Sequence, residues 1–325
     1  MAEPRIVVAG AGAVGCFVGG VLAAAGRDVV LLGRARLMEE ARAGLWLSDF
    51  AGWETRAAPE VSEAPDVLAG ADVVLVCVKS GATEEMGRLI AEHAKERAVV
   101  VSLQNGVRNV GHLRRLLPGR DVRGAMVGFN VVARGPGWFH RSTSGEIMVE
   151  AGAGLAQLMR VPGLVVEERA DIEAVQWGKL ILNLTNAVNA LSGLSLREML
   201  LDRGWRRVMA AQMAEALRVL RAAGIVAKVP AKAPGWAIPP ILRMPTWAFR
   251  RIAAPMLTVD PRARTSMVAD LEAGRRTEVD EFQGEIVRLG ERHGLATPVT
   301  ARVLAEVQAA GRDGVRPLRP DDLFQ

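Results

Sequence analysis

The chain has 325 residues, more than one ordinary hydrophobic core accommodates and about what two domains need. Half of the residues are hydrophobic and 24% are charged, a balance that excludes extended disorder and predicts a globular protein. The net charge of +5 comes from arginines scattered singly or in pairs, without interleaved aromatic residues, so no nucleic-acid binding is predicted.

Neither a signal peptide nor a membrane span is predicted. Residues 1–5 lead directly into a strand-like run, and the longest apolar stretches are interrupted well short of the roughly 18 residues that cross a bilayer. The two cysteines, Cys16 and Cys77, lie in apolar stretches, which is typical of reduced thiols. We therefore expect a cytoplasmic protein without membrane contact.

Strand-like and helical segments alternate through the first half of the chain. The predicted strands are 5–9, 28–32, 71–78, 98–103, 122–129 and 164–167, and the predicted helices are 16–25, 36–43 and 83–94. This alternation indicates parallel crossovers in an open, doubly wound α/β sheet.

From about Asp171 the pattern becomes helical, at 172–191, 205–223, 266–273, 279–293 and 299–310. We place a boundary near residue 170, between an α/β domain (1–170) and a mainly α-helical domain (171–325). Residues 229–261 form a Pro-rich stretch that contains Trp236, Trp247 and Phe249. We interpret it as a long connection whose aromatic residues pack on the helical domain, with a lid or a homodimer contact as alternatives.

A glycine-rich turn, Gly10-Ala11-Gly12-Ala13-Val14-Gly15, follows the first predicted strand and opens the first helix. The spacing alone is weak evidence. In this context, however, Gly10 can form the turn, Gly12 can let a pyrophosphate approach, and Gly15 can bring helix and strand close. Because the helix N-terminus also offers N–H groups to phosphates, we predict a Rossmann-type dinucleotide-binding domain.

The end of the second predicted strand distinguishes the two nicotinamide cofactors. An acidic residue there binds the ribose hydroxyls of NAD, whereas a basic one accommodates the 2′-phosphate of NADP. The strand ends Leu32-Gly33-Arg34, with no acid. NADPH/NADP+ is therefore the predicted cofactor, with a solvated loop arginine as the alternative for Arg34.

Two polar residues follow later strands, at the carboxyl edge where open α/β sheets bind ligands. We interpret Lys79 as a cofactor contact, the alternative being a surface lysine whose stem covers apolar neighbours. Asn105, which precedes Gly106, is equally consistent with a site residue and with an ordinary Asn-Gly turn.

Lys179, Asn183 and Asn186 are spaced i, i+4 and i+7, on one face of the predicted helix 172–191. Because their neighbours are mostly Ile, Leu and Val, we expect these groups to line a cavity; a solvated polar stripe is the alternative. A partly desolvated lysine could bind a carboxylate or protonate a carbonyl oxygen, since burial lowers its pKa.

Local sequence assigns no catalytic role to Ser266, which could cap a helix, or to Glu278, which could lie in a capped first turn. The four histidines are far apart and lack metal-ligand spacing, so no metal site is predicted.

Together these motifs resemble the ketopantoate reductases (2-dehydropantoate 2-reductases) over nearly the whole chain. The similar segments are 10–15, 78–80, 103–107, 177–180, 266–267 and 276–280. The resemblance implies a Rossmann-type domain followed by a helical one, and NADPH-dependent reduction of 2-dehydropantoate, a small 2-oxo acid, to pantoate in pantothenate biosynthesis.

The resemblance also implies residue roles. Lys179 matches the catalytic lysine that protonates the carbonyl oxygen. The substrate-binding positions correspond to Asn105, Asn183 and Ser266, and the cofactor contacts correspond to the glycine turn, Arg34, Lys79, Asn105 and Glu278.

One position departs from the family. Where a second helix Asn is common, eight residues after the lysine, this chain has Ala187. We expect Asn186 to contact the substrate in its place, with Asn189 as the alternative. Another small branched 2-oxo acid is therefore the first alternative substrate, and an NADP-binding protein without turnover is the second alternative function.

Overall fold

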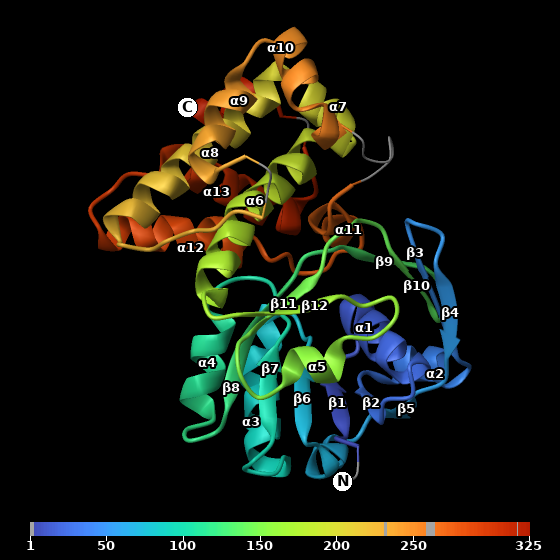
Figure 1. Ribbon diagram of the computed structural model, residues 1–325. Coiled ribbons are helices and arrows are strands. Elements are labelled where there is room, and N and C mark those ends of the chain that lie inside the picture. Colours follow the sequence, from blue (N-terminus) through green and yellow to red (C-terminus); the bar gives the residue numbers. More distant parts are fainter. Residues whose placement is uncertain (1–2, 231–232, 258–263, 317) are drawn as a thin grey trace. The chain divides into compact units, whose positions relative to one another are not determined.

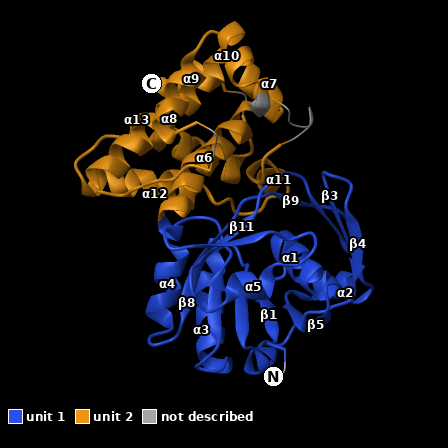
Figure 2. Cartoon of the chain, viewed as in Figure 1, with its two compact units in different colours: residues 1–173 blue, residues 174–325 orange. Residues whose placement is uncertain are grey.

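The computed structural model describes residues 3–230, 233–257, 264–316 and 318–325. The chain forms two compact units, Met1–Glu173 and Ala174–Gln325 (Figure 2). The first is an α/β unit and the second is helical (Figure 1). Within the described residues, no helix is both long and apolar enough to cross a membrane.

An eight-stranded sheet organises the first unit, in the order β12-β11-β8-β7-β6-β1-β2-β5. All neighbouring strands are parallel except β8 and β11. The order reverses between β1 and β6, the switch point at which such sheets bind ligands. The strands are β1 (Ile6–Ala9), β2 (Val29–Leu32), β5 (Glu60–Ser62), β6 (Val73–Val76), β7 (Val99–Ser102), β8 (Val122–Val127), β11 (Ile147–Glu150) and β12 (Val166–Arg169).

Alternate side chains of β1 enter two separate cores. Ile6 and Val8 pack in one core with residues of α1 and α5, whereas Val7 and Ala9 pack in the other with residues of α3 and α4. Burial on both faces explains the continuous apolar strands in the sequence, and it confirms the predicted doubly wound sheet. The α-helices of this unit are α1 (Ala13–Ala24), α2 (Ala35–Arg42), α3 (Thr83–His93), α4 (Asn109–Leu116) and α5 (Leu155–Met159), with short 3-10 helices at η1 (Pro65–Gly70) and η2 (Ser80–Ala82).

A second sheet, absent from the sequence prediction, has the order β4-β3-β10-β9. It packs against α1, where Gly20 leaves room for Leu47: a Cβ at Gly20 would lie 2.8 Å from the Leu47 Cδ1. Trp46 and Trp138 stack across its strands with ring centroids 4.2 Å apart. Its strands are β3 (Leu45–Asp49), β4 (Glu54–Ala57), β9 (Val131–Gly135) and β10 (Trp138–Arg141), so its central pair joins residues far apart in the sequence.

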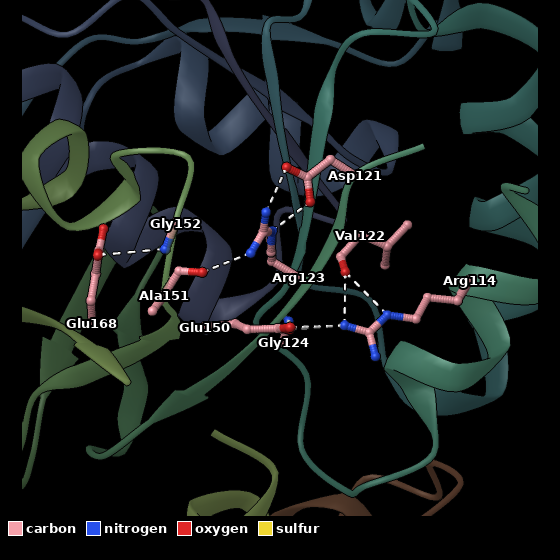
Figure 3. Close-up of polar contacts among 9 residues, drawn as sticks. All are labelled: Arg114, Asp121, Val122, Arg123, Gly124, Glu150, Ala151, Gly152 and Glu168. Carbon is pink, nitrogen blue, oxygen red and sulfur yellow. Dashed lines mark hydrogen bonds and ion pairs between the residues drawn. The ribbon is translucent and has the colours of Figure 1, made fainter. Parts of the chain in front are cut away.

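Arginine contacts hold the β8–β11–β12 edge together (Figure 3). The Arg123 guanidinium pairs with Asp121 and donates to the Ala151 carbonyl at 2.7 Å. Arg114 on α4 pairs with Glu150 at 2.9 Å, and Glu150 also accepts from the Gly124 N–H at 2.8 Å. These contacts fix β11, the antiparallel strand, beside β8.

The second unit contains the helices predicted from residue 171 onward. The predicted ones are α6 (Ile172–Ser192), α8 (Arg203–Ala222), α11 (Ser266–Glu272), α12 (Val279–Arg292) and α13 (Pro298–Asp313). The structure adds α7 (Leu196–Leu201), α9 (Ile238–Arg243) and α10 (Thr246–Ile252), with short 3-10 helices η3 (Gly235–Ala237), η4 (Ala254–Leu257) and η5 (Pro320–Phe324).

The Pro-rich stretch differs from the prediction. Its described part forms η3, α9, α10 and η4, and only Phe249 of the three aromatic residues is buried; residues 231–232 and 258–261 lie outside the described residues. Trp236 and Trp247 are 71% and 76% exposed, so the expectation that they pack on the helical domain was wrong. Short helices bury one face each, and apolar residues such as Ile238, Leu242 and Phe249 occupy those faces.

Candidate active site

The glycine turn has the backbone geometry that each glycine position requires. Gly10 has a φ of +94°, and a Cβ there would lie 2.3 Å from the Val78 Cγ1. A Cβ at Gly15 would lie 2.9 Å from the Gly10 carbonyl oxygen, because α1 begins very close to the end of β1. At Gly12, by contrast, no described atom beyond the adjacent chain lies within 4 Å of the Cβ position. The turn therefore leaves space at the N-terminus of α1, where the N-cap residue is Gly12 and provides no side chain to cap the helix.

The remaining predicted cofactor residues of the first unit lie just past carboxyl ends of strands. Arg34 follows Gly33, just past the end of β2, and is the N-cap residue of α2. Its side chain is exposed and forms no ion pair with a described carboxylate. Lys79 is exposed after β6, at the start of η2. Asn105 is half-buried after β7. Arg36, by comparison, pairs with Glu40 on α2.

A polar network that the sequence analysis missed links the β6 and β7 turns. The Gln104 side chain donates to the Val78 carbonyl at 2.9 Å and to the Thr83 hydroxyl at 2.7 Å. Asn109 donates to the Ser80 hydroxyl at 2.9 Å and to the Asn105 carbonyl at 2.7 Å. The network fixes the backbone around Lys79 and Asn105. Its sequence signal was weak: Gln104 just past a strand, and polar residues at helix starts.

In the second unit, the predicted polar face of α6 is present. Lys179, Asn183 and Asn186 are each half-buried, while Leu180, Ile181, Leu184 and Val188 behind them are buried. The amide groups of Asn183 and Asn186 form no hydrogen bond with a described residue. This face therefore offers two amides beside an ammonium group.

Burial lowers the pKa of Lys179 to about 8, and the negative charge of Glu278 opposes that effect by raising it. Glu278 is half-buried at the N-cap position of α12. Lys179 is therefore protonated at neutral pH yet is far more acidic than an ordinary lysine, as a proton donor requires.

The position next to Lys179, residue 178, has room only for a glycine. A Cβ at Gly178 would lie 2.0 Å from the Lys228 carbonyl oxygen, because residues 228–229 cross α6 at this point. The Lys228 N–H also donates to the Ala174 carbonyl at 2.8 Å. This crossing segment adds to the burial of the helix surface next to Lys179.

Asn189 and Asn186 differ in their surroundings. Asn189 is 0% exposed; its amide donates to the Leu194 carbonyl at 2.9 Å and accepts from the Thr265 N–H at 3.1 Å. Thr265 is the N-cap residue of α11, so Asn189 holds the start of that helix, where Ser266 is exposed. Asn189 is thus a tether of α11, whereas the Asn186 side chain is available to a ligand.

No group of three His, Cys, Asp or Glu side chains with metal-binding geometry occurs in the part of the chain that the structure describes.

Comparisons with known proteins give consistent matches. The family model described as ketopantoate reductase PanE/ApbA matches residues 6–154, and the model of its C-terminal part matches residues 171–311. A 2-dehydropantoate 2-reductase from Halobacterium salinarum is 29% identical over 95% of this chain and 100% of its own length. One from Archaeoglobus fulgidus is 29% identical over 94% and 97%.

Solved structures agree with this fold. A PanE/ApbA family ketopantoate reductase from Ralstonia eutropha is 32% identical, with a TM-score of 0.81 over 99% of this chain and 100% of that one. A D-mandelate dehydrogenase bound to NADH and anilino(oxo)acetate shares the fold at 22% identity, with a TM-score of 0.77. The two family models together span both units, and the Ralstonia structure matches over its full length: this chain belongs to the ketopantoate reductase family.

Proposed function

We propose that this protein reduces 2-dehydropantoate to pantoate with NADPH, as an oxidoreductase acting on CH-OH groups. Family membership and the names of its curated relatives support the reaction. The observation that carries the proposal at residue level is Lys179, an ammonium group with a pKa of about 8 on a helix face with two amides.

The glycine turn fits a dinucleotide. Open space at Gly12 and the uncapped N-terminus of α1 suit a pyrophosphate, which the backbone of residues 10–15 would hold. Arg34 would pair with the 2′-phosphate, and Lys79 and Asn105 would add further cofactor contacts from the first unit. The bound nicotinamide supplies a hydride.

Lys179 would act as the general acid. Its Nζ would donate a proton to the carbonyl oxygen of the substrate while the keto carbon gains the hydride. The hydride forms a new C–H bond, and the electron pair of the C=O π bond forms the O–H bond of the alcohol. Lys179 is left neutral and regains a proton from solvent. Glu278 favours the protonated lysine, because its charge raises the pKa of Lys179.

The substrate would be held by side chains of the second unit. Ser266 and the amides of Asn183 and Asn186 supply hydrogen bonds to its carboxylate and hydroxyl oxygens. They carry no charge, so they orient the substrate without competing with Lys179 for its proton.

Replacing Lys179 by Ala tests this proposal. We expect kcat to fall by a factor of about 100 or more, the range of general-acid contributions, while the Kd for NADPH stays within about twofold. Turnover at the wild-type rate would contradict the role of Lys179. Loss of NADPH binding would indicate a structural defect instead.

The cofactor preference is tested separately by Arg34→Ala. Loss of a charge-assisted contact costs about 1.5–3 kcal/mol, so the KM for NADPH should rise about 10-fold or more while that for NADH changes little. Arg36→Ala, which removes a neighbouring exposed arginine, is the matched control. Equal effects on both cofactors would exclude a 2′-phosphate contact at Arg34.

A different branched 2-oxo acid is the second candidate substrate, favoured by Ala187 at the position of the family Asn. Steady-state kinetics with a panel of 2-oxo acids separates the two. If the kcat/KM for 2-dehydropantoate is no higher than that for pyruvate-like acids, the specific assignment is wrong.

We also propose a cytoplasmic location and a homodimer. The location is supported by the cysteines: both are free thiols, and burial raises the pKa of Cys16 to about 12.

The homodimer is supported by the exposed side chains of Trp236 and Trp247, which favour a partner surface. Sedimentation analysis of the wild type should show a dimer, and the double variant Trp236→Ser with Trp247→Ser should dissociate at lower dilution. A monomeric wild type would refute the homodimer.

A further inference from the structure

A pocket of about 350 Å³ in the second unit includes none of the residues in the proposed active site. Its lining comes from α8, α9 and η5 and consists of Arg203, Arg207, Ala211, Arg243 and Phe324. In Figure 1 the C-terminus lies beside α9. Three of the five lining residues carry a guanidinium group.

Regular secondary structure brings these groups together. Arg203, Arg207 and Ala211 are spaced i, i+4 and i+8 along one face of α8, and the small Ala211 leaves space at the end of the row. The Arg203 Nε donates to the Arg243 carbonyl at 3.4 Å. The Arg207 guanidinium lies 5.4 Å from the Phe324 ring centroid.

A buried arginine holds the wall of the pocket that α9 forms. Arg206 is 0% exposed, and its guanidinium donates to the Leu242 carbonyl at 3.0 Å and the Met244 carbonyl at 2.9 Å. These carbonyls flank Arg243 in the chain. The backbone that carries Arg243 is therefore fixed against α8 before any ligand binds, which lowers the entropic cost of binding.

The pocket carries positive charge on three of its lining side chains. Arg203, Arg207 and Arg243 form no ion pair with a carboxylate among the described residues, and the sequence contains no Asp or Glu from 216 to 259. Two acids close in the chain to the lining residues accept hydrogen bonds from backbone: Asp202 from the Trp205 N–H at 3.1 Å, and Asp322 from the Arg319 N–H at 2.8 Å. An anion in the pocket would relieve the repulsion among three cations.

We propose that this pocket binds a small molecule with two or more phosphate groups. Guanidinium groups match phosphate oxygens in bidentate geometry, and several phosphates complement three positive charges better than one carboxylate does. The volume lies in the range of about 300–1,000 Å³ typical of small-molecule sites. This site is independent of the proposed reductase activity and of its cofactor.

Calorimetric titration with inorganic tripolyphosphate tests the proposal, at low salt and with saturating NADP+ so that the dinucleotide site does not contribute. The test variant is Arg207→Ser with Arg243→Ser. The matched control is Arg250→Ser with Arg251→Ser, which removes two exposed arginines of α10 outside the pocket. Because all four arginines are exposed, both variants should fold, and thermal unfolding checks this.

We expect one tripolyphosphate per chain for the wild type and the control, and binding at least about tenfold weaker for the test variant, since two charge-assisted contacts are lost. Equal weakening in both variants would indicate only general attraction to a basic protein and would overturn the proposal. Absence of binding to the wild type would overturn it too, and citrate binding as tightly as tripolyphosphate would refute the phosphate assignment.

Discussion

At the residue scale, the proposed chemistry of this protein depends on how the surroundings of Lys179 change its pKa. A solvated lysine has a pKa near 10.4 and is a poor proton donor at neutral pH, whereas burial lowers the pKa of Lys179 to about 8. Because Glu278 opposes this shift, the pair sets the pH range in which the lysine is both charged and acidic. Sequence spacing could place Lys179 on a face, but not measure its burial.

This balance predicts a pH profile. If protonated Lys179 is required, kcat/KM should be level below about pH 8 and should fall about tenfold for each pH unit above it. Glu278→Gln removes the charge that raises the lysine pKa, so the break should move to lower pH. An unchanged break in the variant would show that another group controls it; Glu281→Gln on the same helix is the control.

At the scale of secondary-structure elements, two helix starts are held by side chains from other helices. The start of α11 depends on Asn189 of α6, and the start of α13 depends on Glu215 of α8. Both α11 and α13 lack a cap from their own N-cap side chain within the described residues. Local sequence cannot reveal such capping, because donor and acceptor lie tens of residues apart.

Asn189→Ala should act on the substrate through α11. Without the bond to the Thr265 N–H, Ser266 is held less precisely, so the KM for the 2-oxo acid should rise by about 10-fold, the effect of one lost hydrogen bond to a positioned group. The KM for NADPH should stay constant, as measured in the same assays. Asn189→Asp keeps an acceptor for the Thr265 N–H, so the KM for the 2-oxo acid should rise less than in Asn189→Ala. A similar rise in the KM values for both substrates would indicate general damage.

Glu215→Ala should destabilise the second unit. The buried Glu215 carboxylate accepts from the Val299 N–H at 3.1 Å, the Thr300 N–H at 2.9 Å and the Thr300 hydroxyl at 2.6 Å, and so caps α13. Leaving these donors unsatisfied should lower the free energy of unfolding by about 2–4 kcal/mol. Denaturant unfolding measures this, with the exposed Glu291→Ala as control; a loss no larger than the control's would rule out the capping role.

At the scale of the whole molecule, an excess of positive charge accompanies a proposed cofactor and substrate that are both anions. The net charge is +5 and the sequence pI is about 9.8. We expect the KM for NADPH to rise several-fold between low salt and about 0.5 M NaCl, because exposed charges such as that of Arg34 are screened. Arg34→Ala should show a weaker salt dependence in the same assay. A KM that is insensitive to salt would contradict this expectation.

The sequence by itself determined the doubly wound sheet, the helical second half and the glycine turn. Each depends on neighbouring residues: alternation of apolar runs, helical periodicity, or the positive φ that only glycine adopts easily at position 10. Lys179, Asn183 and Asn186 were likewise found from spacing within one helix, although their roles remain proposals.

Only the tertiary structure decided the rest, because the contacts join residues far apart in the chain. Strands β3 and β10 pair with each other although they lie far apart in the sequence, and local sequence patterns cannot predict such a pairing. Gln104 and Asn109 connect two turns that follow different strands. Asn189 is buried and holds the start of α11. Trp236 and Trp247 remain exposed despite their hydrophobicity. Whether a polar or aromatic side chain is buried depends on the elements that pack over it, and the sequence does not contain that information locally.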